Sequence, residues 1–258
     1  LRKKADTIIT WASVQSNWCM QTAAAARMLG LKPIIVLFKT DDLAPGFDGN
    51  LLLDYILEAD IRVREAPKGT PVKSVQALEI LQDVAGEVRA GGFKPYIVPV
   101  GGSLVRGDMD QPFGALSYIE AFAEIQEQAR AAGVRFSHIV HATGSGGTQA
   151  GLVAGAKAMA EECRVIGISV SDPKAPFSKD VREIAEAASR ALDLGLSFEP
   201  EDIEVDDSLA ADGYGVLTRK VANVIRFVFE SVGIVLDPVY TAKAMTGLMD
   251  LVTQGRFR

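Results

Sequence analysis

Cysteine and histidine are scarce in this sequence: Cys19, Cys163, His138 and His141 are the only ones. Two isolated cysteines build no disulfide framework, and the spacing of these four residues matches no zinc-binding pattern. We therefore expect no structural metal. The low cysteine content also fits a reducing, cytoplasmic environment.

Long hydrophobic runs and an excess of basic charge are also missing. No apolar stretch approaches the roughly 20 residues that cross a bilayer. The 27 Lys and Arg residues are outnumbered by 33 Asp and Glu, which gives a formal net charge of -6. Because nucleic acids are held by basic surfaces, we expect neither a nucleic acid nor a membrane as partner, and a small-molecule substrate instead.

What the sequence does contain is an alternation of short, β-branched apolar runs with longer helical patterns. This alternation is typical of parallel sheets covered by helices, so the predicted fold class is α/β. We expect strands at residues 7–10, 33–38, 61–63, 96–100, 137–140, 165–170 and 234–236. We expect helices at 17–29, 51–57, 72–90, 114–132, 149–161, 177–194, 218–232 and 241–253, and loops at 41–49 and 204–215.

The alternation is interrupted at the turn 101–103 and the loop that follows it, which suggests two open parallel-sheet α/β domains. We expect a small domain over residues 1–104 and a larger one over residues 105–258. Leu1 to Lys4 resemble the last turn of a helix, and the sequence stops where a further strand is expected. We therefore expect a piece of a longer chain, with the larger domain incomplete.

A glycine-rich loop, His141-Ala-Thr-Gly-Ser-Gly-Gly-Thr-Gln-Ala-Gly151, follows a predicted strand and opens a predicted helix. Its backbone N–H groups and the positive end of the helix dipole point at one small volume, which suits a phosphate. Gln149 stands where the dinucleotide fingerprint needs its third glycine, and no Gly-Lys-Ser/Thr follows as in a P-loop. A turn that binds nothing is the remaining alternative.

A second polar helix start lies at Ser13-Val-Gln-Ser-Asn17, with Ser16 or Asn17 as the natural N-cap. The simplest interpretation is a cap alone. Together with the glycine-rich loop, however, it gives two anion sites, one suited to a phosphate and the other to a carboxylate.

Eight sequence blocks, in order, resemble the fold type II (tryptophan synthase β-like) pyridoxal-phosphate enzymes, specifically the D-cysteine desulfhydrase and 1-aminocyclopropane-1-carboxylate (ACC) deaminase family. They run through nearly the whole chain, and together they are far more specific than any one of them. The blocks are residues 5–10, 15–17, 21–25, 49–52, 99–103, 143–148, 213–215 and 236–241.

The resemblance implies pyridoxal 5'-phosphate as cofactor and assigns a role to each matching residue. It places Asn17 beside the cofactor's 3-hydroxyl, Ser16 near the substrate carboxylate, and Tyr214 and Tyr240 near the reacting carbons. The threonine hydroxyl of Thr241 would meet the pyridine nitrogen. The cofactor phosphate would lie in the loop formed by Gly144, Ser145, Gly146, Gly147 and Thr148.

Thr241 is the most discriminating of these positions, because ACC deaminases that resemble this block carry a glutamate there. Trp18 and Met20 depart from the His and Arg of many relatives, so that Trp18 either restricts the substrate pocket or packs in the core. The lysine that binds the cofactor covalently would precede Leu1, and neither Lys3 nor Lys4 matches its motif.

The resemblance therefore predicts a lyase that eliminates a β-substituent from a small amino acid, giving a keto acid and ammonia, in a homodimer. ACC deamination, racemisation and sulfonate elimination are alternatives on the same site. A nucleotide-binding oxidoreductase and a noncatalytic relative are alternatives from other classes.

Overall fold

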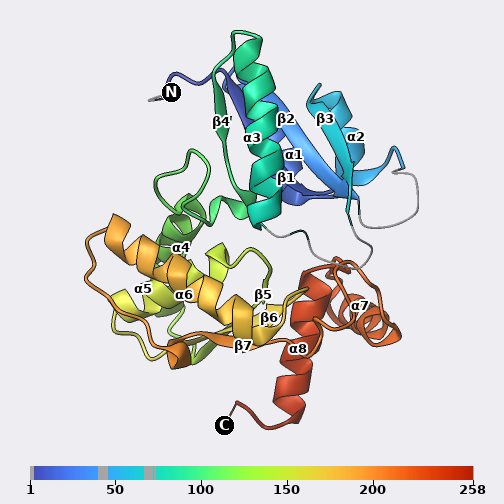
Figure 1. The fold of residues 1–258 in the computed structure, drawn as a ribbon. Coiled ribbons are helices and arrows are strands. Elements are labelled where there is room, and N and C mark those ends of the chain that lie inside the picture. Colours follow the sequence, from blue (N-terminus) through green and yellow to red (C-terminus); the bar gives the residue numbers. More distant parts are fainter. Residues whose placement is uncertain (1–2, 40–45, 67–71, 73, 258) are drawn as a thin grey trace. The chain divides into compact units, whose positions relative to one another are not determined.

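The computed structural model describes residues 3–39, 46–66, 72 and 74–257. The chain divides into two compact units, Leu1–Asp110 and Gln111–Arg258. Each unit contains its own parallel sheet with helices packed against it, so the predicted α/β class is confirmed (Figure 1). The boundary expected between residues 104 and 105 stays a prediction, and the two units divide at Asp110 and Gln111. Residues 1–2 of the expected helix end, 41–45 of the expected loop and position 73 lie outside the described residues.

The first unit is built on a four-stranded sheet of order β3-β2-β1-β4, in which every pair is parallel. Its six residues from Pro33 to Phe38 in β2 are all buried, which explains the continuous apolar run there. The elements are β1 (Thr7–Ser13), α1 (Asn17–Met28), β2 (Lys32–Lys39), α2 (Gly49–Ile56), β3 (Asp60–Glu65), α3 (Ser74–Ala90), β4 (Pro95–Ile97) and a 3-10 turn (Val100–Gly102).

Alternate residues of β2 divide between the two faces of this sheet, as the two-residue period of a strand requires. Ile34, Val36 and Phe38 belong to a core cluster that includes the buried face of α3. Ile35 and Leu37 belong to a second cluster with residues of α1 and α2. The sheet is therefore covered on both faces.

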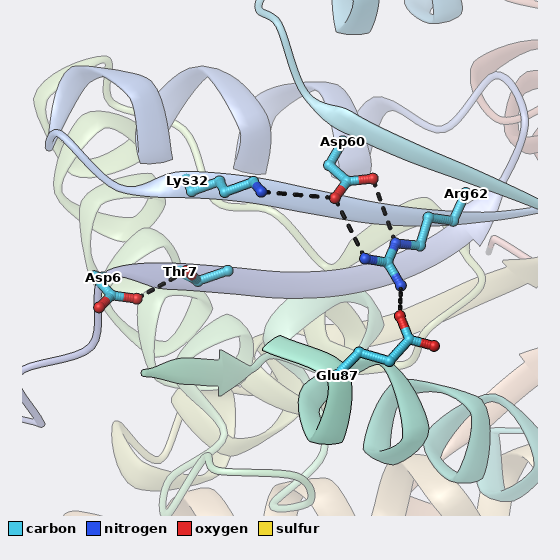
Figure 2. A network of polar contacts seen from close by, with 6 residues as sticks. All are labelled: Asp6, Thr7, Lys32, Asp60, Arg62 and Glu87. Carbon is cyan, nitrogen blue, oxygen red and sulfur yellow. Dashed lines mark hydrogen bonds and ion pairs between the residues drawn. The ribbon is translucent and has the colours of Figure 1, made fainter. Parts of the chain in front are cut away.

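A chain of ion pairs links two strands and a helix of this unit (Figure 2). Arg62 on β3 donates to Asp60 at 3.3 Å and to Glu87 on α3 at 2.5 Å. Lys32 on β2 lies 3.8 Å from the other oxygen of Asp60. Partly exposed pairs of this kind contribute at most about 1 kcal/mol each, so the apolar clusters carry most of the stability.

The second unit is built on a three-stranded parallel sheet of order β5-β6-β7. Helix α8 packs closely on this sheet: a Cβ at its Gly247 would lie only 2.7 Å from the Ile168 side chain of β6. The elements are α4 (Phe113–Ala131), β5 (His138–Thr143), α5 (Gly147–Ala158), β6 (Arg164–Ser169), α6 (Lys174–Ala191), a 3-10 turn (Pro200–Asp202), β7 (Glu204–Asp206), α7 (Arg219–Val232) and α8 (Thr241–Thr253).

Two expectations for this unit were wrong. Residues 204–206, expected as loop, form β7, which is only three residues long and carries two acidic side chains, so it gives no apolar pattern. Residues 234–236, expected as a strand, form none: Ile234 and Val235 are 55% and 75% exposed. An apolar run makes a strand only where a sheet edge and a buried face receive it.

Close packing of α5 on α4 fixes the position of the helix that follows the glycine-rich loop. A Cβ at Gly151 would lie 2.3 Å from the Ala115 carbonyl oxygen, and one at Gly155 would lie 2.7 Å from Phe122 Cβ. Both positions therefore require glycine. Among the helices that the structure describes, none is long and apolar enough to cross a membrane.

Candidate active site

The glycine-rich loop connects the end of β5 at Thr143 to the start of α5 at Gly147. Gly146 is the N-cap, in the left-handed conformation with φ 83°, and no side chain caps the helix. The N–H groups of the first turn have no acceptors within the helix, and that turn holds no acidic residue. The positive end of α5 is thus available to an anion.

Packing beneath the loop holds it in this conformation. A Cβ at Gly146 would lie 3.2 Å from side-chain carbons of both Val181 and Ile184, on α6. A Cβ at Gly144 would lie 3.5 Å from Val170 and 4.0 Å from the ring of Tyr240. Thr143 Oγ1, buried at the start of the loop, has no hydrogen-bond partner in the described part of the chain.

Gln149 stands where the dinucleotide fingerprint would have its third glycine, and its side chain is fully buried. Its Nε2 donates to the Glu204 carbonyl oxygen at 2.7 Å and so connects α5 to β7. A Cβ at Gly167 on β6 would lie 2.2 Å from Gln149 Oε1. In the dinucleotide fingerprint, the third glycine of the helix allows close helix–strand packing. In this protein the glycine at that contact is Gly167, on the strand β6.

Tyr214 and Tyr240 form a hydroxyl pair in the second unit. Their Oη atoms are 2.6 Å apart, and the rings meet edge to face with centroids 6.1 Å apart. Burial, with a smaller effect of the Tyr214 hydroxyl, raises the pKa of Tyr240 well above its ordinary value. Tyr240 therefore stays protonated at neutral pH, and its hydroxyl can donate a hydrogen bond to a bound molecule.

Asp237 precedes the turn that leads into α8, accepts hydrogen bonds from that turn, and was not identified from the sequence. Its carboxylate accepts from the N–H groups of Val239, Tyr240 and Thr241, each at 2.8 Å. It also accepts from Thr241 Oγ1 at 2.6 Å, and that hydroxyl in turn accepts from the Asp237 N–H at 2.8 Å. Burial opposes the effect, but these hydrogen bonds lower the pKa of Asp237 overall. An aspartate just before a helical pattern is the signal that could have found it.

In the first unit, Ser16 is the N-cap of α1: its Oγ accepts from Cys19 N–H at 3.2 Å, and its side chain is buried. Asn17 is exposed at the first helical position, and its Oδ1 accepts from Asn50 Nδ2 at 2.6 Å. The Asn17 amide is thereby oriented with Nδ2 as the end that can donate to a ligand. Asn50 was also missed as a functional candidate, although its sequence block was recognised.

Gln15 joins the starts of α1 and α2 and holds Asn50 in place. Gln15 Oε1 accepts from Asn50 N–H at 2.9 Å, and Asn50 Nδ2 donates back to the Gln15 carbonyl oxygen at 3.0 Å. A Cβ at Gly49 would lie 2.6 Å from Gln15 Oε1, and Gly49 has φ 52°. Only glycine fits there without moving the amide network.

Trp18 is partly buried and packs against the core of the first unit, which favours the packing interpretation of this position. Its indole Nε1 donates to Thr10 Oγ1 at 2.7 Å, and the ring packs against the cluster that contains Cys19 and Leu37. Lys3, which matched no lysine motif, lies 3.5 Å from Asp110 and is exposed.

The described residues thus bring together Gly144, Tyr214, Tyr240 and Thr241 in the second unit, and Ser16 and Asn17 at one helix start in the first. No group of three or more His, Cys, Asp or Glu residues that could hold a metal ion occurs in the described part of the chain. The arrangement offers backbone and hydroxyl donors for anions, and tyrosine hydroxyls for proton transfer.

Comparison with known proteins identifies the family. The family model described as "Pyridoxal-phosphate dependent enzyme" matches residues 1–258. A Pyrococcus furiosus protein provisionally named 1-aminocyclopropane-1-carboxylate deaminase is 40% identical over 98% of this chain and 71% of its own length. The D-cysteine desulfhydrase of Klebsiella pneumoniae is 35% identical over 100% of this chain and 74% of its own.

Solved structures point to the same family and fold. The crystal structure of an ACC deaminase homologue matches 100% of this chain and 72% of its own, with a TM-score of 0.86 and 35% identity. A threonine deaminase from T.th., at 18% identity and a TM-score of 0.55 over 98% of this chain and 74% of its own, shares the fold. The chain therefore belongs to the pyridoxal-phosphate-dependent enzymes, in the family that contains D-cysteine desulfhydrase and ACC deaminase.

Proposed function

We propose that this lyase eliminates a good leaving group from the β-carbon of a small amino acid, as a D-cysteine desulfhydrase, and releases a keto acid and ammonia. The observation that carries the proposal is Thr241, a neutral side chain directly after Tyr240 at the start of α8. Deaminases that resemble this block have a glutamate at the position. The alternative of a nucleotide-binding oxidoreductase has no support in the family to which the chain belongs.

The chemistry of the donor set fits pyridoxal phosphate. The loop from Gly144 to Thr148 offers the uncapped first turn of α5 to the phosphate, and Thr143 Oγ1 is a buried hydroxyl that still lacks a partner among the described residues. By the family resemblance, the Asn17 amide would donate to the cofactor's 3-hydroxyl oxygen. Thr241 Oγ1 would meet the pyridine nitrogen.

When bound, pyridoxal phosphate supplies the electron sink that acidifies the α-hydrogen of the attached amino acid. Thr241 sets the strength of that sink, because a neutral hydroxyl leaves the ring nitrogen less protonated than a carboxylate would. Its hydroxyl donates to Asp237 Oδ1 in the structure, and it would have to turn that hydrogen toward the ring to bind an unprotonated nitrogen. A modest sink is sufficient to lose a thiolate, but it disfavours opening a cyclopropane.

Two further residues complete the proposal. Ser16 Oγ accepts from Cys19 N–H and also hydrogen-bonds with the Cys19 side chain; its hydroxyl hydrogen would turn to the substrate carboxylate when substrate binds. Tyr240 is protonated at neutral pH and would stabilise the departing group by hydrogen bonding; the Tyr214 hydroxyl, 2.6 Å away, can return a proton to Tyr240 if one is transferred. Proton transfer by a positioned group of this kind contributes about 100-fold or more to a rate.

ACC deamination is the second candidate, favoured by the 40% identity with the Pyrococcus furiosus protein of that name. The holoenzyme should be assayed with D-cysteine, L-cysteine, other β-substituted alanines and ACC, and the keto acid identified. Pyruvate with sulfide from cysteine supports the proposal. Formation of 2-oxobutyrate from ACC identifies a deaminase instead, and no turnover of any substrate overturns both.

We also propose that the enzyme is a cytoplasmic homodimer. The family resemblance supports the dimer, and the free, buried thiols of Cys19 and Cys163 are compatible with a reducing compartment. Light scattering of the purified holoenzyme measures the mass directly. A monomeric mass at micromolar concentration would contradict the dimer.

A further inference from the structure

Lys243, in the first turn of α8, is a fully buried lysine that the proposed chemistry does not use. Its ammonium group donates to the carbonyl oxygens of Gly213 at 2.7 Å, Val170 at 3.0 Å and Leu209 at 3.4 Å. A lysine ammonium has three donors, so these carbonyls match its full capacity. With its hydrogens engaged, Nζ is poorly placed to act as a nucleophile or base.

Burying this charge is unfavourable, because no carboxylate lies within ion-pair distance of Nζ among the residues that the structure describes. Burial lowers the pKa of Lys243, and the charge of Asp212 opposes that effect only in part. A methionine or leucine would fill the same space without this desolvation. The three hydrogen bonds are therefore the specific contribution of the lysine.

The three carbonyls belong to segments that the fold must hold together at one edge of the second unit. Val170 follows β6 and packs beneath Gly144 of the glycine-rich loop. Leu209 and Gly213 lie in the irregular segment 209–215, which carries Tyr214. Within that segment, Ala210 N–H and Gly213 N–H close only local turns. Lys243 connects the segment to α8 and to the end of β6.

Helix α8 thus contacts the Tyr214 segment at two points close together. The hydroxyl of Tyr240, immediately before the helix, lies 2.6 Å from the Tyr214 hydroxyl. Lys243, three residues later, donates to the Gly213 carbonyl oxygen, just before Tyr214, at 2.7 Å. Gly213 and Gly215 have φ values of 94° and 74°, so the backbone on either side of Tyr214 is in a conformation that only glycine adopts readily.

We propose that Lys243 is a positioning residue: by binding the Gly213 carbonyl, it places the Tyr214 hydroxyl against Tyr240. The consequence for turnover rests on the proposed function, in which the tyrosine pair transfers a proton. The consequence for the segment does not, because it concerns the protein alone.

The test replaces Lys243 by Met, which is similar in length and has no donor, and by Gln, which keeps two. Amide hydrogen exchange should become at least tenfold faster in segment 209–215 of Lys243→Met, with a smaller increase in Lys243→Gln. Two controls should leave this segment unchanged: Lys220→Met, at an exposed lysine that pairs with Asp250, and Thr246→Val, a buried change in α8. Unchanged exchange in both Lys243 variants would overturn the proposal.

Kinetics of the holoenzyme provide the second measurement. Lys243→Met should lower kcat about 10- to 100-fold with little change in KM, since a small displacement of a reacting group has effects of this size. In a Tyr214→Phe background the same substitution should have little further effect on kcat. An equal loss in both backgrounds would show a general structural role and overturn the proposal. If no substrate is turned over at all, the proposed function fails while hydrogen exchange still decides the role of Lys243.

Discussion

The hydroxyl oxygens of Tyr214 and Tyr240 lie 2.6 Å apart, although the residues are 26 positions apart in the sequence. Hydrogen-bonded hydroxyls that transfer a proton together lose function as a unit. We therefore expect Tyr240→Phe and Tyr214→Phe each to reduce kcat for β-elimination about 100-fold or more. The double variant should be little slower than the worse single one.

Tyr118→Phe is the matched control for this pair, because Tyr118 is 40% exposed on α4 and Tyr214 is 41% exposed. It should leave both kcat and KM unchanged. Steady-state assays of keto acid formation measure the effect, and losses that multiply in the double variant would show that the two hydroxyls act independently.

Gly146 should be essential for cofactor binding, because it combines a left-handed backbone with side-chain carbons 3.2 Å from where a Cβ would lie. We expect Gly146→Ala to raise the dissociation constant for pyridoxal phosphate roughly tenfold or more, which corresponds to about 1.4 kcal/mol. Titration of apoenzyme followed by absorbance measures this constant.

Gly233→Ala is the control for Gly146→Ala, since Gly233 has a similar φ of 72° but open space around it. It should reduce the free energy of unfolding by a similar backbone strain, about 1 kcal/mol, and leave cofactor affinity unchanged. Equal losses of affinity in the two variants would mean that the loop is not the phosphate site.

Much of this fold could be predicted from the sequence, because periodic patterns report directly on long, buried elements. Helix α8 has the bounds that its pattern predicts, Thr241–Thr253, and the glycine-rich loop lies between a strand and a helix as expected. The three-residue β7 could not be predicted, because an element that short has no period.

The residues that hold the candidate site in place were harder to find than those that face a ligand. Asn50 contacts Asn17 across 33 positions, and Lys243 contacts Val170 across 73. Such hydrogen bonds join segments that only the folded chain brings together, and a single side chain leaves no repeating pattern. Asp237 is the exception, because its hydrogen bonds are local and reach only to Thr241, four residues later.

The Gln149 side chain fills the space that a side chain at Gly167 would need. The effects of substitutions at these two positions on stability should therefore be strongly coupled. A Cβ at Gly167 would lie 2.2 Å from Gln149 Oε1 and 2.8 Å from Thr143 Cγ2. We expect Gly167→Ala to reduce the free energy of unfolding by about 1–3 kcal/mol through overpacking. Gln149→Ser should recover part of that loss in the double variant, as urea denaturation can measure. Simple additivity would show that the strand and helix move apart freely.

Asp54 on α2 should make the stability of the first unit depend on pH. Its side chain is fully buried, both carboxylate oxygens lack partners among the described residues, and burial raises its pKa to about 7 from 3.8. Between these values the unfolded chain has released a proton that the folded protein keeps. The contribution of Asp54 to stability is therefore complete below pH 3.8 and is lost as the pH rises toward 7, with a slope of up to about 1.4 kcal/mol per pH unit.

Asp54→Asn isolates this effect, because the amide has nearly the same shape and does not ionise. The variant should gain stability relative to the parent protein as the pH rises from 5 to 8, in urea denaturation followed by circular dichroism. Asp60→Asn is the control, because the Asp60 carboxylate is partly exposed and pairs with Arg62 and Lys32 in the same unit. Its effect on stability should not change in the same way between pH 5 and 8. A stability difference for Asp54→Asn that does not change with pH would mean that Asp54 is ionised in the folded protein, with a partner or solvent that compensates its charge.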